Sequence, residues 1–109
     1  MKRAAPVAHV ADLVRPAREL AGVHCRIREG LPEWRFHERL VARMPDQEYL
    51  VIRADFDYRD SLVRQFPGTF SVPARFVRHM MVVADLAHAE AGAVEDALDA
   101  AWQLQRSAD

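Results

Sequence analysis

The feature that most constrains the fold is the order of apolar runs and turn signals between residues 39 and 103. Two runs rich in strand-forming residues meet at Pro45-Asp46-Gln47, a cluster that is typical of a turn. A helical segment follows and is stopped by Pro67-Gly68, and two more short apolar runs precede a closing segment with helical periodicity. This order of strands and helices indicates an α+β domain.

The bounds of the expected elements come from the spacing of apolar residues. A first helix that ends at Gly22 is predicted because apolar residues recur at helical spacing at positions 10, 13, 14, 17, 20 and 21. Residues 24–32 mix apolar and charged residues, and no element is predicted there. Strands are predicted over residues 34–37, 40–44, 49–53, 69–72 and 79–86, and the final helix is expected to begin near Glu90.

These elements predict a single domain over residues 1–109 with the order α-β-β-β-α-β-β-α. A chain of 109 residues is long enough for one hydrophobic core. Helices on one face of an antiparallel sheet form a two-layer α+β sandwich. The other face of the sheet is then open to solvent or used for contact.

Two residues are assigned structural roles in the predicted helices. Asp57 followed by Asp60 resembles a capping box, so Asp57 is expected to cap the second helix at the positive end of its dipole. Trp102 shares the apolar stripe of Val94 and Leu98 and is expected to anchor the core.

Composition bounds the compartment of the protein. The single cysteine, Cys25, has no intrachain partner, which excludes a disulfide framework and favours a reducing compartment. The N-terminus begins with Lys2 and Arg3, but His9 and Asp12 interrupt the apolar stretch that a signal peptide needs. No apolar run approaches the roughly 20 residues of a membrane span. We therefore expect a cytoplasmic protein without a membrane partner.

The residues that carry catalytic or metal chemistry form no recognisable motif. The 5 histidines show no metal-ligand spacing, and the carboxylates of Asp55, Asp57 and Asp60 are explained by helix capping. Cys25 lacks the sequence signature of a nucleophile, and no Gly-rich phosphate loop is present among only 4 glycines. We predict no catalytic residue, no metal site and no cofactor, and hence a binding domain rather than an enzyme.

Charge distribution is the feature with functional content. Residues 61–79 contain Arg64, Arg75 and Arg78 and no acid. Residues 80–109 contain six acids and a single basic residue, Arg106. Arginines 35, 39, 43, 75 and 78 are expected on hairpins and loops, away from the acidic last helix. Such a basic edge could bind phosphate or an acidic partner. The alternative is that these arginines are solvated and have no binding role. Their number would then reflect a GC-rich coding sequence, since all but one of the 15 basic residues are arginine.

Five segments, in this order, resemble the MmcQ/YjbR family. They are LAGV at residues 20–23, the hairpin WRFHERLVAR, the unit LVIRADFDYRDSLV, the turn PGTF leading into SVP, and the closing ALDAAWQL. The resemblance covers most of the chain and implies the same small α+β fold. It also implies DNA binding through a double-wing arrangement of loops and hairpins, and no catalytic residue set. The stretch from Arg75 to His79 resembles a basic segment with histidine in that family.

The sequence therefore predicts a non-enzymatic binding domain of this type, with DNA as the first expected partner. The predicted nucleic-acid-binding residues are Arg35, Arg39, Arg43, Arg75, Arg78 and His79. The net charge of −1 restricts the expected binding to weak, non-specific affinity. The alternative is a protein-interaction module or homodimer that uses the open sheet face, which would require an apolar patch on that face.

Overall fold

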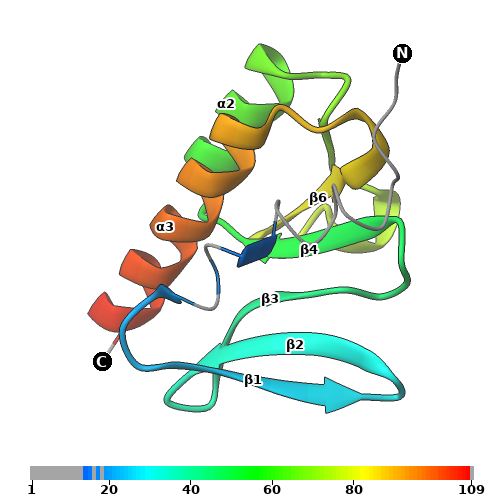
Figure 1. The fold of residues 1–109 in the computed structure, drawn as a ribbon. Coiled ribbons are helices and arrows are strands. Elements are labelled where there is room, and N and C mark those ends of the chain that lie inside the picture. The colour runs from blue at the N-terminus through cyan, green and yellow to red at the C-terminus, as the bar shows by residue number, and fades with distance from the viewer. Residues whose placement is uncertain (1–13, 16, 18, 109) are drawn as a thin grey trace.

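A computed structural model describes residues 14, 15, 17 and 19–108 of the chain. These residues form a six-stranded antiparallel sheet with helices packed on one side (Figure 1). The strands are β1 (Val23–Arg28), β2 (Leu31–Phe36), β3 (Arg39–Arg43), β4 (Tyr49–Arg53), β5 (Phe70–Ser71) and β6 (Met81–Asp85). The helices are α2 (Phe56–Gln65) and α3 (Ala91–Ser107), and the 3-10 turns are η1 (Ala74–Phe76) and η2 (Leu86–His88). The predicted α+β class, with an antiparallel sheet and helices on one face, is confirmed.

The strands are arranged in the order β1-β2-β3-β4-β6-β5. The first four form a meander, so four strands precede α2, and the predicted order with three strands there is wrong. The additional strand is β1, which lies in the segment where no element was predicted. Described residues 14, 15, 17 and 19 are helical, and the other positions of the predicted first helix lie outside the described residues.

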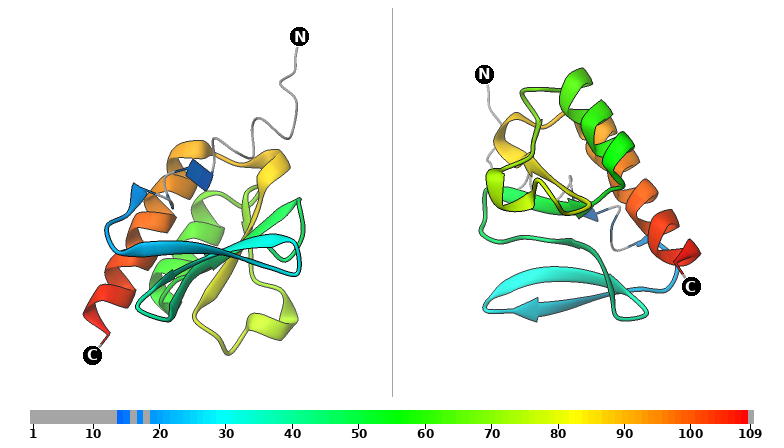
Figure 2. Two further views of the ribbon diagram at one scale, coloured as in Figure 1. Left: turned by 60° about the horizontal axis from the view of Figure 1, so that its bottom comes forward. Right: turned by 180° about the vertical axis from the view of Figure 1, so that it is seen from behind.

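The main core lies between the sheet and α3. Leu50 and Ile52 alternate along β4 onto the helix side and cluster with Val94 and Leu98 of α3, all at 0% exposure. Burying aliphatic side chains of this size stabilises the fold by roughly 1.5–3 kcal/mol each. Figure 2 shows α2 and α3 on the same side of the sheet, so one face of the sheet has helical cover and the other has none.

The face opposite the helices is partly covered by η1. Phe76 of η1 forms a second small cluster with Val51 of β4 and Val83 of β6, and all three side chains are buried. Figures 1 and 2 show this turn on the side of the sheet away from α2 and α3. The expectation of an open face therefore applies to the part of the sheet formed by β1–β3, and the part over β4 and β6 is covered.

A buried arginine holds the η1 segment in place. Arg59 of α2 is 8% exposed, and its Nη1 lies 3.3, 3.1 and 3.0 Å from the carbonyl oxygens of Phe76, Val77 and His79. Its Nε donates to the carboxylate of Asp60 at 3.0 Å. The carbonyls of Phe76 and His79 also accept from the amides of His79 and Met81, at 2.9 and 2.8 Å. The guanidinium thus joins three carbonyls of one segment and gives the Val77 carbonyl its donor.

Two predicted structural roles require correction. The N-cap of α2 is Asp55, whose Oδ1 accepts from the amide of Tyr58 at 2.9 Å, and Asp57 lies one residue inside the first turn. Trp102 is half-buried rather than part of the core, and its Nε1 donates to the carbonyl of Ala21 at 2.8 Å. Each prediction named the correct helix. The residue that caps α2 is Asp55 and not Asp57, and Trp102 is half-buried and not fully buried.

Replacing the two aspartates separately tests the cap. We expect Asp55→Ala to lower the free energy of unfolding by about 1 kcal/mol, because the Tyr58 amide loses its acceptor. Asp57→Ala should cost only about 0.3 kcal/mol, through the helix dipole alone. Urea unfolding of both variants measures the difference, and an Asp57→Ala loss as large as that of Asp55→Ala would contradict the assignment.

Replacing Arg59 tests the clamp on η1. We expect Arg59→Met to lower the free energy of unfolding by about 1–3 kcal/mol while keeping the apolar stem. The Val77 carbonyl loses its donor, and the carbonyls of Phe76 and His79 each lose one of two donors. Arg64→Met, on the exposed side of the same helix, should stay within about 0.5 kcal/mol of the wild type. Chemical denaturation of both variants makes the comparison, and equal, small losses would show that the clamp contributes nothing.

Candidate nucleic-acid interface

The register of the meander places arginines on the sheet face that lacks helical cover. Arg26 is directly opposite Glu33, Glu33 is opposite Arg43, and Arg43 is opposite Val51. Directly opposed residues of an antiparallel sheet lie on the same face. Because Val51 clusters with Phe76, this face is the one that points away from α3.

Two further arginines share this face by strand alternation. Arg28 lies two residues beyond Arg26 on β1, and Arg35 lies two residues beyond Glu33 on β2. We call the resulting surface the arginine face, and it consists of Arg26, Arg28, Arg35 and Arg43.

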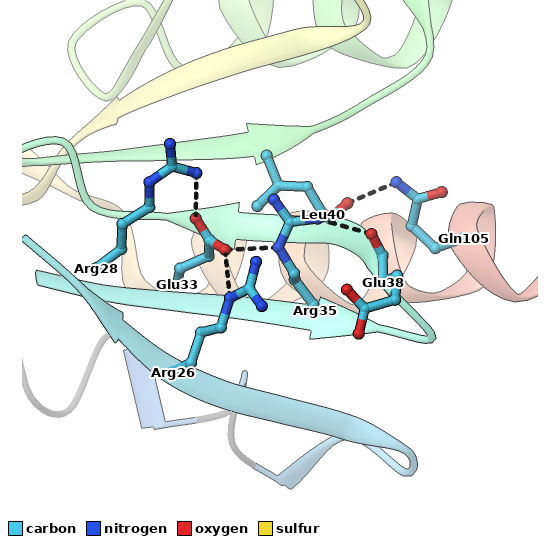
Figure 3. Close-up of polar contacts among 7 residues, drawn as sticks. All are labelled: Arg26, Arg28, Glu33, Arg35, Glu38, Leu40 and Gln105. Carbon is cyan, nitrogen blue, oxygen red and sulfur yellow. Dashed lines mark hydrogen bonds and ion pairs between the residues drawn. The ribbon is translucent and has the colours of Figure 1, made fainter.

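A buried carboxylate lies at the centre of the arginine face. The side chain of Glu33 is only 2% exposed and accepts from Nε of Arg35 at 2.5 Å and from Nε of Arg26 at 3.1 Å (Figure 3). Nη1 of Arg28 forms a longer ion pair with the second carboxylate oxygen at 4.0 Å. The hydrogen bond from Arg35 is the main reason that the pKa of Glu33 lies below its ordinary 4.5, and the Arg26 bond adds to it against the opposing effect of burial.

This arrangement orders the guanidinium groups without neutralising them. Four arginines around one carboxylate leave a formal charge of +3 on the face. The side chains of Arg26 and Arg28 are 55% and 66% exposed, so their charge reaches solvent, while Arg35 is 24% exposed. Glu33 engages Arg26 through Nε, and the terminal nitrogens of Arg26 make no hydrogen bond to any described residue.

The turn after β2 holds Arg35 from its other side. Nη1 of Arg35 donates to the carbonyl of Glu38 at 2.7 Å (Figure 3). His37 and Glu38 both adopt positive φ, 49° and 69°, which a two-residue hairpin of this twist requires. The contact therefore links the position of Arg35 to a strained turn between β2 and β3.

The predicted site residues are not all brought together. Arg35 and Arg43 share the arginine face. Arg75 lies on the same side of the sheet in a neighbouring hollow, and Pro45 lines both that hollow and the one beside Arg43. Arg78 and His79 are exposed in the turn after η1, and His79 contacts the ring of Phe76.

Arg39 lies on the other side of the sheet. The β2–β3 register shifts between Trp34 and Arg35, and Arg39 is paired with Phe36, which packs against the main core. Its Nη1 donates to the carbonyl of Gln105 in α3 at 3.1 Å. The expectation that Arg39 lies away from the last helix is therefore wrong, because the register shift turns its side chain toward α3.

Arg26 and Arg28 were missed from the sequence. Both belong to β1, whose residues VHCRIR alternate apolar and polar side chains. That alternation is the signal of a strand and could have identified both residues as members of one face.

The acids of α3 lie in the helix layer on the opposite side of the sheet. Glu95, Asp96 and Asp99 are exposed on this helix. The pKa of Tyr58 in α2 is raised, first by burial and then by the charges of Asp96 and Asp99. The described part of the molecule thus separates its arginine face from an acidic helix surface.

The described part of the chain contains no group of three or more His, Cys, Asp or Glu side chains that could hold a metal ion. No described helix has the length and apolar character needed to cross a membrane. Cys25 is exposed on β1.

Comparisons of the chain with family models, with curated proteins and with solved structures found no match.

The pH dependence of stability tests the role of Glu33. At pH 7 we expect Glu33→Gln to lower the free energy of unfolding by about 1–2 kcal/mol, because partly exposed arginines lose a charged acceptor. A folded-state pKa below 4.5 means that the carboxylate stabilises the fold above that value and loses this effect as the pH falls through the folded-state pKa. The gap between wild type and variant should therefore narrow below about pH 4.

The matched control is Glu29→Gln, an exposed acid on the same hairpin. It should change the free energy of unfolding by less than about 0.5 kcal/mol at every pH. Urea denaturation at pH 7 and at pH 3 provides the measurement. A Glu33→Gln loss that is equally large at both pH values would assign Glu33 a packing role and not an electrostatic one.

Proposed function

We propose that this protein is a non-enzymatic domain that binds nucleic acid through the phosphate backbone, using the arginine face. The observation that carries the proposal is a cluster of four arginines on one sheet face, three of which pair with one buried carboxylate, with a formal charge of +3. Guanidinium groups are planar, always charged and matched to phosphate oxygens.

The dimensions of the arginine face suit a polyanion. Arg26 on β1 and Arg43 on β3 are separated by two strand spacings, about 10 Å. Duplex DNA carries one negative charge for roughly every 1.7 Å of its axis, so a surface of this width can contact a few phosphates at once. A single small anion would use only part of the face.

The buried aromatic residues of the sheet and of η1 offer no stacking surface to bases. Trp34, Phe70 and Phe76 are 1%, 1% and 9% exposed, which removes them as platforms on which bases could stack. Phosphate contacts without base contacts give affinity but little sequence preference. Together with a net charge of −1, this supports weak binding, with a Kd of roughly 10⁻⁴–10⁻⁶ M at physiological salt.

The resemblance of the sequence to the MmcQ/YjbR family supports the same proposal, because DNA binding has been proposed for that family. The contact residues proposed from the structure differ from those predicted from the sequence. Arg26 and Arg28 join Arg35 and Arg43, Arg75 extends the basic surface beyond Pro45, and Arg39 is left out because it contacts α3.

The alternative of a dimer or protein-interaction module on the same face has less support. Such a module needs an apolar patch on the face away from the helices. That face is charged over β1–β3, and Phe76 covers it over β4 and β6.

Salt dependence distinguishes phosphate binding from other association. The double variant Arg26→Gln, Arg43→Gln should weaken DNA binding about equally for unrelated sequences. It should also flatten the plot of log K against log salt by about two units, near one for each lost phosphate contact. Fluorescence anisotropy with two unrelated DNA duplexes at several salt concentrations provides the data.

The control removes the same charge from the helix side of the molecule. Arg64→Gln, Arg106→Gln should leave the slope of the salt plot within about half a unit of the wild type. Equal effects of the two double variants would mean that net charge alone matters and that the arginine face is not the site. No binding at low salt would remove the proposed function.

A further inference from the structure

A hollow lies at one end of the arginine face. It has a volume of about 340 Å³ and is lined by Arg28, Glu29, Leu31, Pro32, Glu33, Arg43, Met44 and Pro45. Arg28 ends β1, Leu31 begins β2 and Arg43 ends β3. The hollow therefore lies at the end of the sheet where these three strand termini meet. Ligand sites in proteins have volumes of roughly 300–1,000 Å³, and this hollow falls within that range.

The hollow is lined by two arginines and two glutamates, but the charge of Glu33 is already engaged by arginines outside the lining. Glu33 accepts its two short hydrogen bonds from Arg26 and Arg35, and only the 4.0 Å ion pair connects it to Arg28. Arg43 forms no ion pair or side-chain hydrogen bond with any described residue. Two guanidinium groups therefore enter the hollow with unused donors, and each can provide paired N–H groups to an oxyanion.

The remaining wall is apolar and held by the backbone. The amide of Met44 donates to the carbonyl of Pro32 at 3.0 Å, which extends the β2–β3 pairing beyond Arg43. Met44 is 7% exposed, and Leu31, Pro32 and Pro45 are half-buried. This surface offers packing to a sugar or base without offering hydrogen bonds, while the arginines provide the polar contacts.

Glu29 is the only lining acid besides Glu33. It is exposed and lies in the β1–β2 turn with a φ of 55°, followed by Gly30 at 82°. Because Glu29 is exposed, solvent screens its charge. An anionic ligand must therefore compete with the Glu29 carboxylate for Arg28 and Arg43, which favours a ligand of high charge.

We propose that the hollow binds a terminal phosphate monoester, carried by a nucleotide or by the end of a nucleic-acid strand. This inference rests on the proposed function and names the group that the same face recognises. A phosphate monoester carries a charge of about −1.5 to −2 and three strong acceptor oxygens. An internal phosphodiester carries one charge, so the paired donors of Arg28 and Arg43 favour the monoester.

The test compares single-stranded oligonucleotides of one sequence that carry a 5′-phosphate, a 3′-phosphate or no terminal phosphate. At low salt we expect a phosphorylated strand to bind on the order of ten-fold more tightly than the unphosphorylated strand, through one or two added charge-assisted hydrogen bonds. Adenosine 5′-monophosphate and adenosine, measured by calorimetry, separate a free nucleotide from a strand end as the source of the phosphate.

Matched variants locate the effect within the face. Arg43→Gln should abolish the preference for the phosphorylated strand. Arg75→Gln removes an equal charge from the neighbouring hollow and should lower the affinity for both strands while keeping the preference. Thermal unfolding checks that both variants are folded, and Arg28→Gln serves as the second variant if Arg43→Gln is not.

The outcomes distinguish the inference from the proposed function. Equal binding of all three strands overturns the inference and leaves the proposed function intact. Binding of adenosine 5′-monophosphate without binding of any strand overturns the proposed function and supports the hollow as a nucleotide site. A preference that survives Arg43→Gln and Arg28→Gln removes the hollow as its cause.

Discussion

The arginine face depends on the interaction of the buried Glu33 carboxylate with the guanidinium groups of Arg26 and Arg35. Four guanidinium groups on three adjacent strands would repel one another, and a single carboxylate at 2% exposure fixes two of them by short hydrogen bonds. A buried carboxylate without these donors would be costly, so the acid and the bases require each other. The same carboxylate leaves a surplus of three positive charges facing solvent, and this surplus is what the proposed function uses.

The fold separates this charge from the acids of the chain. Alternation along β4 sends Leu50 and Ile52 into the core beneath α3, while Val51 faces the other side and receives Phe76. Arg59 fixes the η1 segment over that part of the sheet by binding three of its carbonyls. The part of this face that no helix or turn covers is β1–β3, and it carries the arginines.

Much of the fold could be predicted from the sequence because its signals are local. The turn at Pro45-Asp46, the stop at Pro67-Gly68 and the stripe of the last helix gave the strands and helices from β2 onward. β1 was missed because, as an edge strand with five exposed residues, it shows only the alternation of apolar and polar residues and lacks the apolar run that marks a buried strand. Arg39 was misplaced because a register shift between neighbouring strands leaves no trace in periodicity. Glu33 gave no signal, because burial by residues distant in sequence cannot be read from its neighbours.

The most direct test of the account is to observe the arginine side chains during binding. NMR spectra of the isotope-labelled protein should be recorded while an unphosphorylated oligonucleotide is added at low salt. The account predicts shifts of the Nε–H resonances of Arg26 and Arg35 and of backbone amides in β1–β3, with the exposed residues of α3 unchanged. Shifts confined to α3 or to Arg64 and Arg106, with β1–β3 unaffected, would contradict it.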